Sequence, residues 1–94
     1  MENKTKVQLL EEERKNRIEL CKDFFKNKLK ELREEKGYSQ KTVAHKLGVA
    51  VSTYANWEQG RTEPSIYDIW NLKLVFCVEA NELFDFGDIS AYKR

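Results

Sequence analysis

The side chains best suited to bind a ligand lie in a short segment between Gly48 and Gly60. Helical spacing puts Ser52, Thr53 and Asn56 on one outward face of this segment. A carboxamide both donates and accepts hydrogen bonds, and a hydroxyl group can do either. These three residues therefore form either a surface that recognises a hydrogen-bonding pattern or simply the solvated side of a surface helix.

No motif in the chain indicates catalysis or metal binding. His45 is the only histidine and lies beside Lys46 on a polar face, where no motif supplies a nucleophile or a carboxylate. Cys21 and Cys77 are far apart and lack the spacing of a zinc site or a disulfide framework. We therefore expect no enzyme activity and no cofactor, and we interpret both cysteines as small core or half-buried residues.

Composition and charge limit the number of domains and the kinds of partner that the chain can have. The chain has 94 residues, 40% of them hydrophobic, which is enough for one core and too few for two. Its net charge of +1 neither requires nor excludes nucleic acid, although residues 23–64 carry a mild basic excess. No apolar run could span a membrane and no leader is visible, so we expect a cytoplasmic protein without a membrane partner.

The first predicted helix covers residues 23–36 and ends at Gly37. Its buried face is formed by apolar residues spaced four, four and three apart, namely Cys21, Phe25, Leu29 and Leu32. Residues 1–22 are rich in charge, and we expect them to form an extension that either continues this helix or frays.

Two short helices follow. Ser39 is a good N-cap for a two-turn helix over residues 41–47, which Gly48 ends. The next helix begins near Val51 and ends at Gly60. Its buried face carries two aromatic residues, Tyr54 and Trp57.

A fourth helix begins after Ser65, with Asp68 in the register of a capping box. We expect its inner face to contain Ile66, Ile69, Leu72 and Phe76. A short fifth helix over residues 80–84 supplies Leu83 to the core. Five helices with short connections and no alternating pattern predict an all-α, compact bundle.

The domain organisation follows from these elements. We expect a charged extension over residues 1–22, one compact domain over residues 23–86 and a C-terminal tail over residues 87–94.

Residues 40–59 form the most informative unit, a helix, a tight turn and a second helix. Gly48 tolerates the positive φ that the turn needs, and Ala44 is small enough for the closest approach of the two helices. Over residues 24–84 the chain resembles the helix-turn-helix family of phage Cro and repressor proteins, also called Xre-like. The matching positions are 29–37, 39–40, 44, 47–49, 52–54, 57–61, 64–65, 69, 72, 78 and 82–83.

The resemblance implies a repressor-like domain whose recognition helix, residues 51–58, lies in the major groove of double-stranded DNA. It implies that Asn56 pairs with adenine through its amide. Ser52 and Thr53 would bond to bases or phosphates, and Val51 would touch a thymine methyl group.

The family pattern also assigns orienting and structural roles. Gln40 would contact the DNA backbone and brace a base-reading residue, while Lys41 and Arg61 would neutralise phosphates. Arg33 and Glu58 match a pair that ties the first helix to the end of the recognition helix. Breaking such a pair by removing one partner costs about 3–5 kcal/mol.

The sequence departs from the family pattern at three positions. Ala50 replaces a capping Ser or Thr, which removes about 1 kcal/mol of capping. Val51 occupies a position that is often polar. Cys77 stands where the family usually has Gly, and a side chain in a left-handed cap costs about 1 kcal/mol.

A second apolar stripe lies on the fourth helix and consists of Tyr67, Trp70, Leu74 and Cys77. One core cannot use both stripes of this helix. Leu10 and Ile18 in the N-terminal extension also lack a partner. We expect the N-terminal helix to cover part of the stripe and a homodimer contact to cover the rest.

These observations lead to two hypotheses about function. The first is a transcriptional regulator, expected to be a repressor, that binds an operator as a homodimer. Its half-sites would be about 34 Å apart, one turn of DNA. The second is a protein-interaction module or antitoxin-type partner protein that uses the stripe around Tyr67 and Trp70.

Overall fold

The computed structural model describes residues 3–84, which form five helices and no strand. Their bounds are Lys6–Lys36 (α1), Gln40–Leu47 (α2), Val51–Glu58 (α3), Ile66–Phe76 (α4) and Ala80–Leu83 (α5). The predicted all-α class and the order of the elements are confirmed. The predicted tail over residues 87–94 lies outside the described residues.

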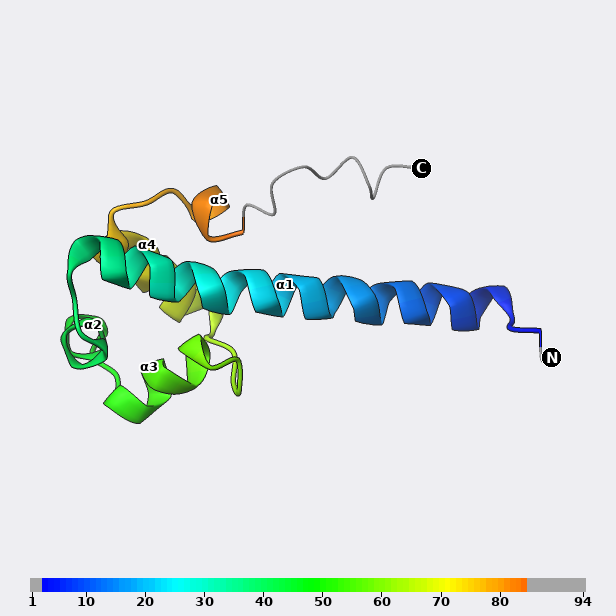
Figure 1. The fold of residues 1–94 in the computed structure, drawn as a ribbon, viewed down its shortest axis with the longest axis horizontal. Coiled ribbons are helices and arrows are strands. Elements are labelled where there is room, and N and C mark those ends of the chain that lie inside the picture. The colour runs from blue at the N-terminus through cyan, green and yellow to red at the C-terminus, as the bar shows by residue number, and fades with distance from the viewer. Residues whose placement is uncertain (1–2, 85–94) are drawn as a thin grey trace.

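Helix α1 is longer than the buried stripe alone predicted. It begins at Thr5, whose hydroxyl accepts a hydrogen bond from the backbone N–H of Gln8, while the Gln8 side chain accepts one from the Thr5 N–H. The charged extension is therefore helical and continuous with the core part of α1. Figure 1 shows its N-terminal half projecting beyond the other helices as a straight rod.

Short polar caps fix the ends of the other helices. Ser39 accepts a hydrogen bond from the N–H of Thr42 at the start of α2. Ser65 and Asp68 form the predicted capping box of α4. Cys77 follows α4 in a left-handed conformation with φ 56°, the only positive φ at a non-glycine residue in the described chain.

The core lies between the C-terminal half of α1 and the four shorter helices. Its fully buried side chains are Leu29, Val43, Ala44, Tyr54, Leu72, Phe76 and Leu83. Phe25 in α1 stacks on Phe84 after α5, with ring centroids 5.4 Å apart. Each of the five helices contributes at least one buried side chain, so α2 and α3 are held in place from several directions.

One core prediction for α4 is wrong. Ile66 is 77% exposed, whereas Leu72 and Phe76 are buried and Ile69 is half-buried. At 100° per residue, Ile66 lies about a quarter turn from the centre of that buried face. It therefore belongs with the exposed side of α4.

Candidate nucleic-acid interface

The turn between α2 and α3 depends on one backbone conformation. Gly48 has φ 74°, its N–H donates to the carbonyl of His45, and the N–H of Val49 donates to the carbonyl of Ala44. A Cβ on Gly48 would meet no atom within 4 Å, so the requirement for glycine here is conformational and not steric. Ala44 is fully buried, and α2 and α3 are in contact.

Helix α3 divides into a buried face and an exposed face. Tyr54 and Trp57 are buried and meet edge to face, with centroids 6.1 Å apart. Val51 and Ser52 are exposed, whereas Thr53 and Asn56 are half-buried. The amide of Asn56 makes no hydrogen bond within the described part of the chain.

The start of α3 has no side-chain cap, as Ala50 predicted. The end of α3 is closed by backbone hydrogen bonds instead. The N–H of Arg61 donates to the carbonyl of Asn56 over 2.9 Å, which folds the following loop back against the helix.

An ion pair joins the end of α3 to α1. Arg33 donates from Nε to Oε2 of Glu58 over 2.7 Å and from Nη2 to Oε1 over 3.1 Å, a bidentate geometry. The side chains are only 15% and 4% exposed, respectively. Arg33 also donates to the carbonyl of Tyr38, and Gln40 at the start of α2 donates to Glu58 Oε1 over 3.2 Å. Glu58 therefore connects α1, α2 and α3 at a single carboxylate.

This arrangement shifts the ionisation of both charged partners. Burial alone would raise the pKa of Glu58, but the hydrogen bonds from Arg33 and Gln40 outweigh it and lower the pKa below its ordinary value. The hydrogen bond to Glu58 raises the pKa of Arg33, against the opposing effect of burial. Both groups are held in their charged forms.

The hydroxyl of Tyr54 lies beside this pair without a partner at hydrogen-bonding geometry among the described residues. Burial raises its pKa well above the ordinary value, and the nearby negative charge of Glu58 adds to the shift. Tyr54 is thus a neutral core residue, fixed by packing.

The comparison with protein families decides how this geometry is classified. The helix-turn-helix family model matches residues 29–75, half of the chain, from the C-terminal part of α1 to α4. The chain belongs to the helix-turn-helix family. It is of the Xre type that the sequence predicted.

Two relatives of this helix-turn-helix protein come from Bacillus subtilis (strain 168). The HTH-type transcriptional regulator AnsR is 39% identical over 57 residues, which are 61% of this chain and 49% of AnsR. The SPbeta prophage-derived uncharacterized HTH-type transcriptional regulator YonR is 34% identical over 60 residues, which are 64% of this chain and 56% of YonR. The chain thus spans about half the length of the curated relatives that it matches.

A solved structure extends the similarity to three dimensions. The crystal structure of the restriction-modification controller protein C.AhdI from Aeromonas hydrophila superposes with a TM-score of 0.64 and 36% sequence identity. The match covers 71% of this chain and 98% of C.AhdI.

The remaining predicted interface residues of the helix-turn-helix unit lie around α3. Lys41 and Arg61 are exposed, Lys41 on α2 and Arg61 in the loop after α3. Gln40 is half-buried, because its amide is turned toward Glu58.

Sequence reasoning missed two basic positions next to this surface. His45 and Lys46 line a shallow depression together with Lys41 and Val51, where α2 meets the start of α3. The spacing of four between Lys41 and His45 places both on one side of α2, a signal that was available in the sequence. The Nζ of Lys46 also lies 5.2 Å from the ring centroid of Tyr38.

The predicted second stripe on α4 is present but uncovered. Tyr67, Trp70 and Leu74 are all exposed, and Lys73 lies over the ring of Trp70 at 5.2 Å. The expectation that the N-terminal helix folds back over part of this stripe is therefore wrong. The reason is that α1 continues straight, so its extension leaves the domain (Figure 1).

Residues 3–84 contain neither a membrane span nor a metal site. None of the helices there is both long enough and apolar enough to cross a membrane. Within the same residues, no group of His, Cys, Asp or Glu side chains is arranged to hold a metal ion.

Proposed function

We propose that this protein binds double-stranded DNA sequence-specifically, with α3 in the major groove, and acts as a transcriptional regulator. The observation that carries this proposal is the division of α3 into a polar exposed face and an aromatic face locked into the core. An α-helix fits the major groove, where each base pair presents a distinct pattern of donors and acceptors. The names of AnsR, YonR and C.AhdI, all regulators or controllers, support the same proposal.

Each residue on the outward face of α3 has a role suited to its chemistry. Asn56 can pair bidentately with adenine because its amide makes no hydrogen bond among the described residues. Ser52 and Thr53 bond to bases or phosphates, and Val51 contacts a thymine methyl group.

Residues beside α3 orient the helix without reading bases. Lys41 and Arg61 are exposed cations on either side of α3 and neutralise phosphates. Gln40 acts from the start of α2, where its hydrogen bond to Glu58 fixes its position. A DNA-binding role of this kind places the protein with DNA in the bacterial cytoplasm.

The test is selection of duplexes from a random pool by the purified protein at fixed salt. We expect enrichment of a motif in which Asn56→Ala removes the preference at one adenine position, a loss of about 1–3 kcal/mol in discrimination. Asn71→Ala, which truncates an exposed asparagine on α4, is the matched control and should leave the motif unchanged. If the folded wild-type protein enriches no motif, this function is wrong.

A second function has its own observation. Tyr67, Trp70 and Leu74 form an exposed stripe of large apolar side chains, which could anchor a partner protein. The protein would then act as an interaction module or an antitoxin-type partner. Loss of a protein partner on Trp70→Ala, with DNA binding unchanged, would support this second function.

A further inference from the structure

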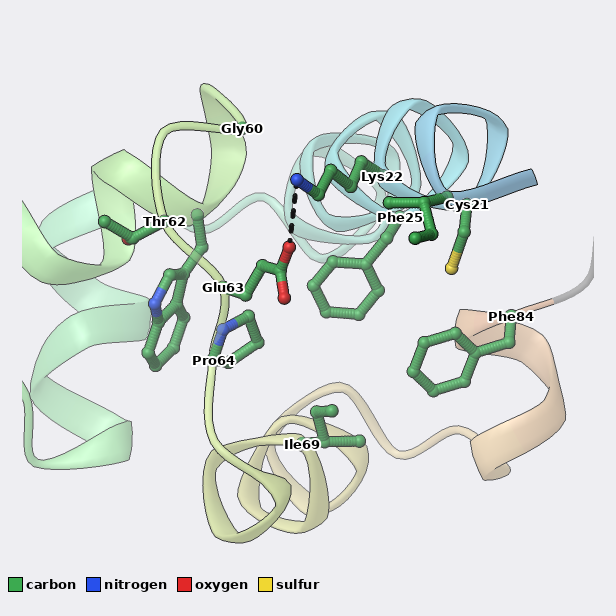
Figure 2. A pocket seen from close by; sticks show the side chains of 11 residues that line it. Cys21, Lys22, Phe25, Gly60, Thr62, Glu63, Pro64, Ile69 and Phe84 are labelled. Carbon is green, nitrogen blue, oxygen red and sulfur yellow. Dashed lines mark ion pairs between the residues drawn. The ribbon is translucent and has the colours of Figure 1, made fainter. Parts of the chain in front are cut away.

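An apolar cavity lies between α1, the loop after α3 and α4. Its volume is about 260 Å³. The apolar side chains that line it include Ile18, Cys21, Phe25, Ile69 and Phe84. Figure 2 shows Cys21 and Phe25 of α1 facing Phe84 across this space. A dry apolar cavity of about 150 Å³ binds benzene, so this cavity can hold a phenyl ring.

The polar residues that line the cavity do not require a polar occupant. Lys22 of α1 and Glu63 of the loop after α3 pair with each other over 3.3 Å (Figure 2). Thr62 adds one hydroxyl group to a lining that is otherwise mainly apolar. An occupant without polar atoms therefore fits this cavity best, because a buried polar group needs a hydrogen-bond partner.

The chain leaves the five-helix domain at the wall of this cavity. Phe84 follows α5 and stacks on Phe25, with ring centroids 5.4 Å apart and an angle of 14° between the rings. Phe86 comes two residues later in the sequence, and two residues span at most about 7 Å. Phe86 is thus the first large apolar side chain after the cavity wall, ahead of Ile89 and Tyr92.

We propose that the side chain of Phe86 occupies this cavity and so docks the segment after α5 onto α1. Its phenyl ring carries no polar atom, as the lining requires. The ring extends the stacked pair of Phe25 and Phe84 into a cluster of three aromatic rings. In this position it covers the side chain of Cys21.

The short tether favours Phe86 over a residue of another molecule. A group joined to the cavity wall by a single residue has an effective concentration in the millimolar range. A second copy or a separate partner at micromolar concentration competes poorly with such a group. The docked segment also ties α1 to residues 60–64, the loop that carries Arg61.

Labelling of Cys21 tests the proposal in the full chain without DNA, so the result is independent of the proposed function. Cys21 is half-buried, whereas Cys77 is exposed at the end of α4 and serves as an internal reference. N-ethylmaleimide is added to the folded protein, and each cysteine is followed by peptide mass spectrometry. We expect Phe86→Ala to raise the labelling rate of Cys21 more than about tenfold, because no ring then covers it, and to leave the rate of Cys77 unchanged.

Two further variants separate docking of Phe86 from a general loss of structure. Tyr92→Ala is the matched control, since it removes an aromatic ring from the same segment and should leave the labelling rate of Cys21 unchanged. Phe86→Leu keeps an apolar side chain and should keep most of the protection, even if Phe86→Ala fails to fold. Circular dichroism checks that each variant keeps its helices. Equal labelling of Cys21 in wild type and folded Phe86→Ala, or an equal increase with Tyr92→Ala, would overturn the proposal.

A disulfide tests whether the occupant comes from the same molecule. In a Cys77→Ala background, Phe86→Cys brings a second thiol to Cys21, and a disulfide needs Cα atoms about 4.4–6.8 Å apart. We expect oxidised glutathione to produce an intrachain disulfide, seen as a monomer with both thiols blocked. Tyr92→Cys in the same background is the control and should form a disulfide far more slowly. Interchain disulfides, or equal rates for the two variants, would contradict docking of Phe86 within its own chain.

Discussion

At the scale of single residues, Glu58 has the largest structural role beside the proposed reading face. Its carboxylate accepts hydrogen bonds from Arg33 of α1 and Gln40 of α2. Glu58 itself ends α3, the helix whose outward face is proposed to contact DNA. A buried carboxylate is stable only when it is paired, so the position of α3 depends on these two hydrogen-bond donors.

Glu58→Gln tests this role through the pH dependence of stability. The native state lowers the pKa of Glu58, so the unfolded chain binds the proton first as the pH falls. The stabilisation is complete above the unfolded pKa of about 4.3 and is lost as the pH falls through the lower, native pKa. Denaturant unfolding should show Glu58→Gln to be less stable by about 1–3 kcal/mol at pH 7 and less sensitive to acid than wild type.

A control separates this effect from a general change of charge. Glu35→Gln alters an exposed carboxylate on α1 and should keep the acid dependence of the wild type. Equal acid dependence in wild type and Glu58→Gln would show that the pair contributes nothing to stability.

At the scale of elements, local chemistry determined where most helices begin and end. Ser39, Gly48 and the pair of Ser65 and Asp68 predicted the bounds of α2 and α4, because caps and left-handed residues act within one turn. Cys77 is an exception that lowers stability. It has a left-handed backbone conformation at the end of α4, and this conformation favours glycine.

Cys77→Gly should therefore stabilise the protein. The expected gain is about 1 kcal/mol in the free energy of unfolding, measured by denaturant titration. Cys77→Ala also removes the thiol but keeps the Cβ, so it should give no gain. A similar gain in stability from both variants would show that the thiol, and not the left-handed backbone conformation, destabilises the protein.

Two other features of the elements differ from what their apolar spacing predicts. A buried stripe does not predict the length of α1, because the exposed half of this helix has no buried residue. Its start is fixed by the capping box of Thr5 and Gln8, a local signal that the sequence does contain. Ile66 is exposed although it lies three residues before Ile69, because a spacing of three in the first turn of α4 does not by itself continue the buried face.

Parts of the candidate site depend on contacts between distant residues. The helix over residues 51–58 is present as predicted, because its two aromatic residues define a buried helical face. The hydrogen bond from Gln40 to Glu58 joins positions 18 apart in sequence, and only the packing of α2 against α3 brings them together.

At the scale of the whole molecule, residues 3–84 form a five-helix domain from which the N-terminal half of α1 projects (Figure 1). The homodimer expected from the sequence would bind an operator of two related half-sites, about 34 Å apart if they lie one DNA turn apart.

The most direct test of DNA reading by α3 is the affinity for the selected duplex and for a scrambled duplex, measured at several salt concentrations. We expect Arg61→Ala to weaken both complexes and to reduce the slope of log K against log salt by about one. Asn56→Ala should keep that slope and lose the preference for the selected duplex. Binding that is independent of salt, or an equal loss on both duplexes with Asn56→Ala, would contradict major-groove reading by α3.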